Sequence, residues 1–167
     1  MNLYQTLPNP PESLSEGSIL ARLVDGIGFR YRVATESFTQ KEIEFCPLEG
    51  SMNMMQLLDH IYNLVAWTGT AFKLDFSKKK TLVSFQDYRL ETLALCQKLS
   101  QHLKKMTNAE LGAVSVYLKR TDTHYSFWYL INGPFADILT HVGQINSWRR
   151  ISGNPVPIIS SFTGEPY

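Results

Sequence analysis

Four histidines are the side chains of this chain best suited to acid-base or metal chemistry: His60, His102, His124 and His141. His141 follows Asp137 by four residues. In a helix, side chains with this spacing share a face, and their Cβ atoms lie about 5 to 6 Å apart. One metal ion can bridge that separation, because imidazole nitrogens and carboxylate oxygens both bind divalent metals at about 2 Å. Asp137 and His141 are therefore a candidate pair of metal ligands.

His60 is the candidate third ligand. It lies beside Leu57 and Leu64 at the border of the apolar face of a predicted second helix, and Asp137 and His141 lie at the border of a predicted fourth. At a rise of 1.5 Å per residue, His60 and His141 each lie about 11 to 14 Å from the start of their helix, which is near its middle. The two histidines therefore lie at similar heights in the bundle whether the two helices run parallel or antiparallel. Three ligands leave a coordination position for water or substrate, which is typical of a catalytic metal site. Such an ion lowers the pKa of a bound water or holds a thiol as thiolate.

Other residues have both a structural and a functional interpretation. Glu49 precedes the helix that carries His60, so it either stabilises that helix end by its charge or orients a ligand. Arg149 either interacts with the carbonyls at the end of the last helix or holds an anionic substrate. The aromatic run at residues 127–129 either packs or forms a substrate wall. Cys46 is the cysteine to test for reactivity. The motifs Glu-x-x-His and His-Glu-x-x-His are both absent, which argues against a di-iron bundle site and a zinc protease site.

Four amphipathic helices must position these residues. Apolar residues recur at helical spacing over residues 13–34, 51–68, 84–105 and 134–151. The helix starts are predicted from a capping box at Ser13–Glu16, an N-cap at Ser51, the pair Ser84 and Asp87, and Pro134 at a first helical position. Four such helices in one small chain are most economically packed as an all-α four-helix bundle.

The connections carry little regular structure of their own. Residues 39–43 predict one helical turn, and Gly153 with the prolines beyond it ends the last helix. Before that helix, apolar residues alternate with polar ones and predict a short β-hairpin. The alternating residues are Val114, Val116 and Leu118, then Tyr125, Phe127 and Tyr129. We expect a single domain over residues 1–167, with an extended lead-in at 1–12 and an extended tail at 152–167.

Composition excludes several functional classes. The 167 residues are 44% apolar and carry 16 Lys and Arg against 15 Asp and Glu, a net charge of +1. This balance argues against a nucleic-acid partner, which usually requires a basic face. No stretch approaches the roughly 18 uncharged apolar residues that span a membrane, and the start lacks a basic segment followed by an apolar one. The two cysteines form no CxxC motif. We expect a soluble, cytoplasmic protein without a membrane partner.

The two segments that carry the candidate ligands resemble the DinB-like superfamily of small bacterial four-helix bundles. These segments are SMNMMQLLDHIYNLVAWT and NGPFADILTHVGQINSWRRISGNP, and the resemblance runs from the first helix to the Gly-Asn-Pro after the fourth. It implies that a histidine of the second helix joins a His-x-x-x-His pair on the last helix to bind a divalent metal, often zinc or nickel. Here that set becomes His60, Asp137 and His141. A carboxylate in place of an imidazole makes the site harder and more anionic, which favours manganese, iron or nickel.

The resemblance implies a function class but no single reaction. Characterised relatives include transferases and isomerases that use a low-molecular-weight thiol, and homodimers are expected. The sequence therefore predicts a metal-dependent enzyme, a thiol-dependent S-transferase or a hydrolase, acting on a small-molecule substrate. The alternative is a non-catalytic ligand-binding or protein-interaction module in which Asp137 marks a lapsed metal site.

Overall fold

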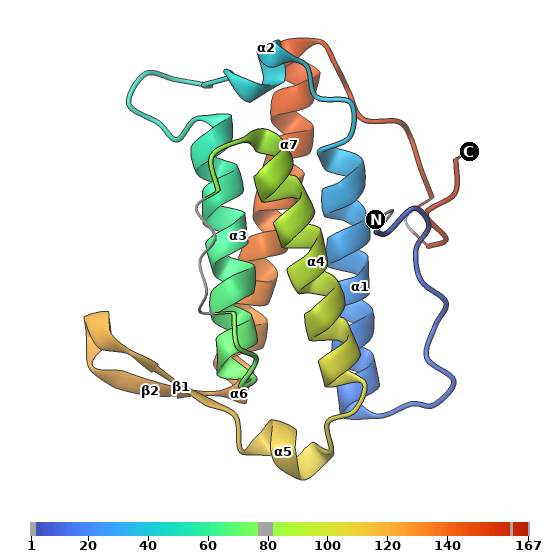
Figure 1. Cartoon of the computed structure of the whole chain (residues 1–167), viewed down its shortest axis with the longest axis vertical. Helices are drawn as coiled ribbons and strands as arrows, with labels where there is room; N and C mark the ends of the chain where they lie inside the picture. Colours follow the sequence, from blue (N-terminus) through green and yellow to red (C-terminus); the bar gives the residue numbers. More distant parts are fainter. Residues whose placement is uncertain (1–2, 77–81, 161, 167) are drawn as a thin grey trace.

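Four long helices form the body of the protein, shown in Figure 1 as a computed structural model. They are α1 (Glu16–Ala34), α3 (Met54–Ala71), α4 (Phe85–Leu103) and α7 (Ala136–Ser152). Helices α1 and α3 each pack against both α4 and α7, so the four-helix bundle predicted from the sequence is confirmed. The structure describes residues 3–76, 82–160 and 162–166, and the outermost positions of the predicted lead-in and tail, 1–2 and 167, together with residue 161, lie outside it.

The core is formed by the apolar stripes of the four helices. Each helix contributes side chains that are at most 4% exposed, and such burial stabilises the fold by about 1.5 to 3 kcal/mol for each large aliphatic residue. Examples are Leu20, Val24 and Ile27 of α1, Leu57, Leu58 and Ile61 of α3, Leu93, Leu99 and Leu103 of α4, and Ile138, Val142 and Ile145 of α7. The ligand candidate His60, next to the buried Ile61, is itself only partly buried and lies at the edge of this core.

Capping boxes begin three of the long helices. The box predicted at Ser84 and Asp87 is confirmed: the Asp87 amide donates to Ser84 Oγ at 3.1 Å. The box predicted at Ser13–Glu16 is wrong. Ser15 has the extended backbone of an N-cap and exchanges hydrogen bonds with Ser18, so Glu16 is the first helical residue rather than the third.

The second long helix begins and ends later than predicted. Asn53, not Ser51, is its N-cap, and the Gln56 amide donates to Asn53 Oδ1 at 2.9 Å. Ser51 instead donates from Oγ to the carbonyl of Leu48 at 2.6 Å, which holds a turn before the helix. At the other end the helix continues beyond Thr68 to Ala71.

Short elements connect the helices at the two ends of the bundle (Figure 1). The predicted turn at residues 39–43 is confirmed as α2 (Gln40–Ile43), and α5 (Asn108–Gly112) follows α4. The predicted hairpin is also confirmed: β1 (Ser115–Leu118) pairs antiparallel with β2 (Thr123–Ser126) around the single turn η1 (Lys119–Thr121). The alternation did not extend as far as predicted, because Phe127 and Tyr129 belong to the next helical turn, α6 (Phe127–Leu130).

The last helix is preceded by a distorted helical segment, η2 (Ile131–Phe135), which joins α6 to α7. Gly133 has non-helical angles of φ −91° and ψ −105°, and Pro134 lies inside this segment rather than at the first position of α7. Gly133 and Pro134 distort the backbone because proline lacks the amide that an α-helix requires there. Helix α7 ends at Gly153, whose φ is +89°, so Ser152 belongs to the helix and not to the tail.

The ends of the chain pack along the bundle. Tyr4 is 8% exposed and lies over Gly28 of α1, where a Cβ atom would come within 2.5 Å of its ring. Near the other end, Ile159 and Pro166 form an isolated antiparallel bridge. Within the part of the chain that the structure describes, every helix is too short or too polar to cross a bilayer.

Candidate metal centre

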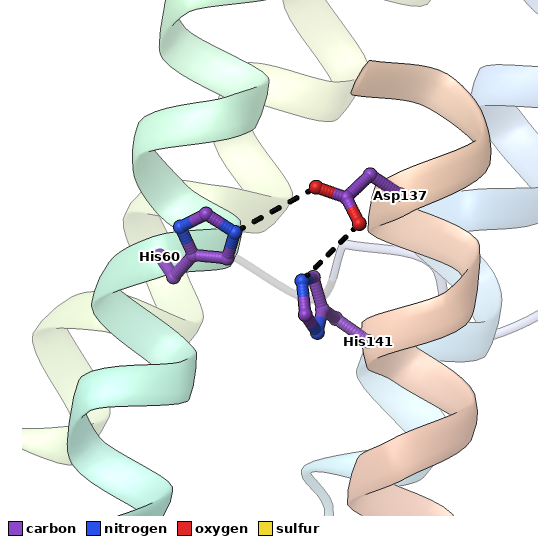
Figure 2. A group of neighbouring side chains, drawn as sticks. All are labelled: His60, Asp137 and His141. Atoms are coloured by element: carbon purple, nitrogen blue, oxygen red, sulfur yellow. Dashed lines mark ion pairs between the residues drawn. The ribbon is translucent and has the colours of Figure 1, made fainter. Parts of the chain in front are cut away.

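Three candidate ligands from two helices meet in one place. His60 comes from α3, and Asp137 and His141 come from the first half of α7. Figure 2 shows the three side chains pointing toward one another between the two helices. The Asp137 carboxylate lies between the histidines: Oδ2 is 3.7 Å from His60 Nε2, and Oδ1 is 3.3 Å from His141 Nε2. The two imidazole rings meet edge to face at 4.8 Å between their centroids.

The spacing of the three side chains fits a single metal ion. One ligand atom from each residue lies within 4.8 Å of the others. A tetrahedral ion bound at about 2.1 Å holds neighbouring ligand atoms about 3.4 Å apart, so small side-chain rotations suffice to close the group around an ion. Among residues 3–76, 82–160 and 162–166, no other group of three His, Cys, Asp or Glu residues has this arrangement.

The site is open to solvent on one side. The side chain of His141 is 18% exposed, that of His60 38% and that of Asp137 46%. A fully enclosed site would have all of its ligands buried. Partial exposure instead leaves room for a water molecule or a substrate atom to complete the coordination of a bound ion.

Packing fixes the position of α7 relative to α3. Phe135, at the end of η2, is 1% exposed, and its ring lies 6.3 Å from that of Phe72, which follows α3. One and two turns further on, Ile138 and Val142 are both 2% exposed. These buried residues alternate with Asp137 and His141, so the core contacts of α7 direct the two ligand candidates toward α3.

The arrangement of helices is shared with a solved structure. The crystal structure of a DinB-like protein, YjoA, from Bacillus subtilis superposes with a TM-score of 0.62, covering 82% of this chain and 96% of that one at 16% identity. The chain has the DinB-like fold. No family model matches the sequence, and no curated protein matches it either. At this identity the likeness establishes the fold alone, and the site rests on the geometry of its own residues.

Gln144 is a neighbour of the site that sequence reasoning missed. Its Oε1 lies 2.9 Å from His141 Nδ1. In the tautomer with the proton on Nδ1, His141 donates that proton to Gln144 Oε1, and Nε2, which faces Asp137, is free to bind a metal. The available signal was the spacing, since Gln144 follows His141 by three residues and so shares its helical face.

Two other candidate functional residues, Glu49 and Cys46, lie in the loop before α3 and outside the group formed by His60, Asp137 and His141. Glu49 is exposed in the loop before α3. The exposed Cys46 has its Sγ 3.2 Å from the carbonyl of Leu48, in the turn that precedes the helix. Neither residue belongs to the metal-type group.

Arg149 has a structural role rather than a substrate role. It is 2% exposed, and its guanidinium donates to the carbonyls of Ala34 and Glu36 at 3.0 and 2.9 Å. These carbonyls lie at and beyond the end of α1, so Arg149 serves a different helix from the one predicted. It also donates to the carbonyl of Asn154 at 2.8 Å, just past its own helix. Burial lowers the pKa of its guanidinium.

The remaining histidines and the aromatic run lie elsewhere. His102 is near the end of α4, and His124 lies in β2 with its ring 5.1 Å from that of Tyr117. Trp128 and Tyr129 are 73% and 60% exposed, so the packing interpretation of the aromatic run is wrong for these two side chains. They occupy the outer side of α6, whose buried residue is Leu130.

Proposed function

We propose that this chain binds one divalent metal ion through His60, Asp137 and His141, between α3 and α7 of the DinB-like fold, and that it is a metal-dependent enzyme. The observation that carries the proposal is the convergence of these three side chains within 4.8 Å. His60 and Asp137 are 77 positions apart in the sequence. Their meeting also matches the ligand positions that the family resemblance implies.

The donor set bears on the metal. Two imidazoles and one carboxylate suit zinc and nickel, which the resemblance implies, and the carboxylate also makes manganese or iron acceptable. The rest of the coordination shell is left to water or substrate, because the three side chains are partly exposed. We therefore propose zinc or nickel as the first metals to test and manganese or iron as the next.

The residues of the chain supply binding and orientation. Gln144 holds the Nδ1 proton of His141 and so presents Nε2 to the site. Asp137 presents one oxygen to each histidine and supplies the negative charge that a divalent ion requires. A bound divalent ion supplies a Lewis acid, which lowers the pKa of a water or thiol at the open position. This chemistry suits either transfer of a low-molecular-weight thiol or hydrolysis of a small-molecule substrate.

Turnover assays on the purified chain test the enzymatic part of the proposal. Two probe reactions are suitable: conjugation of a low-molecular-weight thiol to an activated aryl halide, and hydrolysis of an activated ester. We expect a metal-dependent rate in one of them. That rate should fall at least 100-fold in His141→Ala and stay unchanged in His102→Ala, a matched histidine outside the site.

The outcomes separate the proposed enzyme from a binding module. A metal-dependent rate that survives in His141→Ala would contradict the assignment of the site. Metal binding with no turnover in either reaction would favour the non-catalytic ligand-binding or interaction module over these two enzyme classes.

A further inference from the structure

A cavity lies at the end of the bundle where α3 and α4 end, away from the candidate metal ligands. Its volume is about 590 Å³, which falls in the range of small-molecule sites, about 300 to 1,000 Å³. Its walls are the last turns of α3 and α4 and the segment from α5 to β1. Figure 1 shows α5 below the ends of α3 and α4, and Glu110 of α5 is among the lining residues. None of His60, Asp137 and His141 lines the cavity.

The lining of this cavity combines an apolar base with a basic rim. Phe72 and Val114 are 1% and 7% exposed and form the apolar part, together with the partly buried Met106. Lys73 and Lys105 are the exposed cationic residues of the rim. An occupant would therefore contact buried apolar side chains on one side and ammonium groups on the other.

The acidic residue of the rim, Glu110, is hydrogen-bonded to Thr107, the N-cap of its own helix α5. The Glu110 carboxylate accepts hydrogen bonds from the Thr107 amide at 2.8 Å and from Thr107 Oγ1 at 2.9 Å. These bonds, with smaller contributions from His102 and Lys73, lower the pKa of Glu110. Lys73 and Lys105 form no ion pair with any residue that the structure describes. The two lysines and the one glutamate of the lining together carry a net charge of +1.

We propose that this cavity binds a small organic anion: a carboxylate that carries an aryl or short alkyl body. The apolar body lies against Phe72 and Val114, and burial there removes its own apolar surface from water. The carboxylate lies at the rim, where Lys73 and Lys105 donate hydrogen bonds to it. This site is independent of the proposed metal centre and requires no metal.

Calorimetric titration of the metal-free protein with 4-phenylbutyrate tests the proposal. We expect saturable 1:1 binding, at least ten-fold weaker binding in the double variant Lys73→Gln, Lys105→Gln, and unchanged binding in Lys98→Gln. Lys98 is an exposed lysine of α4 that does not line the cavity, so it controls for the loss of a surface charge. Binding should also be unchanged in His141→Ala, which separates failure of this proposal from failure of the proposed metal centre.

Two matched probes test the two halves of the recognition. The neutral alcohol 4-phenylbutanol keeps the apolar body, and butyrate keeps the carboxylate, and we expect each to bind at least ten-fold more weakly than 4-phenylbutyrate. Ala113→Trp, which places a large ring in the cavity wall, should abolish binding while leaving the helical circular dichroism intact. Equal binding of the alcohol and the carboxylate would overturn the proposal. Wild-type affinity in the double lysine variant would also overturn the proposal. Lys73 and Lys105 would then serve only as favourable charges near the C-terminal ends of α3 and α4.

Discussion

Asp137 is the residue on which the metal centre depends most, because it is the acidic ligand and its carboxylate lies beside an imidazole nitrogen of each histidine. Its two oxygens lie 3.7 Å from His60 Nε2 and 3.3 Å from His141 Nε2. Without it, two imidazoles remain in a partly exposed site and the site loses the carboxylate that offsets the charge of an ion. The carboxylate also distinguishes this chain from the three-histidine set that the family resemblance implies.

Replacing Asp137 by histidine should therefore change which metal is preferred rather than abolish binding. We expect Asp137→His to keep zinc affinity within about ten-fold of the wild type and to weaken manganese binding more strongly, because imidazole is a softer ligand than carboxylate. Competition titrations against a chelator, run with zinc and with manganese, measure this difference. Asp137→Ala is the comparison and should lose both metals. An unchanged zinc-to-manganese preference in Asp137→His would show that Asp137 does not contact the ion.

Gln144 should tune the affinity of the site without binding the ion. Gln144→Leu removes the acceptor for the Nδ1 proton of His141, and loss of such an outer-shell partner typically weakens metal binding by about 10- to 100-fold. Gln144→Glu keeps an acceptor at the same position and should retain or improve the affinity. Both variants are measured by the same competition titration. If leucine and glutamate bind the metal equally well, the contact at 2.9 Å between Gln144 Oε1 and His141 Nδ1 has no role in the site.

At the residue scale, the sequence was sufficient to name the three side chains that the structure brings together. The spacing of Asp137 and His141 and the borderline position of His60 on its helix carry that prediction. The role of Arg149 could not be predicted, because the carbonyls it binds belong to a helix more than 100 positions earlier in the chain. A long-range contact of this kind leaves no periodic signal in the sequence.

At the element scale, Arg149 ties the ends of α1 and α7 together. Arg149→Met should destabilise the protein by about 3 kcal/mol, because it leaves several buried carbonyls without a donor and each hydrogen bond to a charged group contributes about 1.5 to 3 kcal/mol. Urea unfolding followed by circular dichroism measures this change. Arg149→Lys keeps the charge but loses the forked geometry, so we expect an intermediate loss. A methionine variant as stable as the wild type would contradict this role.

Glu42 of α2 should make the stability of the same region depend on pH. Burial raises its pKa, but hydrogen bonds from Thr39, Asn154 and Ser152 outweigh burial and lower the pKa from 4.5 to about 2. The pKa of Glu42 is lower in the folded state than in the unfolded state. The ionised carboxylate therefore stabilises the fold fully above pH 4.5, and this stabilisation is lost as the pH falls toward 2. A shift of this size corresponds to about 3 kcal/mol.

Urea unfolding of the wild type and Glu42→Gln at several pH values tests this linkage. The difference in unfolding free energy between the two proteins should be largest above pH 4.5 and should shrink as the pH falls toward 2. Comparing the two proteins cancels the titration of the other carboxylates. A difference that stays constant over this range would show that the Glu42 carboxylate is not stabilised in the folded state.

Helix content was predictable from the sequence, whereas several helix ends were not. Ser84 and Asp87 cap α4 as predicted, but Ser15 and Asn53 are used in place of Ser13 and Ser51. Each pair offers two polar residues that are able to cap a helix within three positions, and the choice depends on the direction in which the preceding loop arrives. The distortion at Gly133 has a local cause instead, because Pro134, which follows it, lacks the amide that a regular helix requires there.

At the scale of the whole molecule, the bundle explains why distant residues form one site. Helices α3 and α7 are neighbours that each pack on α1 or α4, and their apolar stripes meet in the core. Residues at the borders of those stripes are therefore brought together at the edge of the bundle, between polar surface and core. The periodicity predicted four helices, the matching levels of His60 and His141 favoured the pairing of α3 with α7, and the structure confirms that these two helices pack together.

The amount of metal bound by the purified, tag-free protein tests the central claim most directly. After incubation with zinc, nickel, manganese and iron in turn and removal of free ions, elemental analysis should find close to one equivalent of at least one metal. His60→Ala and Asp137→Ala should both lose it, and His124→Ala, a histidine of the hairpin, should keep it. Metal at background level in the wild type, or full occupancy in His60→Ala and Asp137→Ala, would contradict a metal centre built from these three residues.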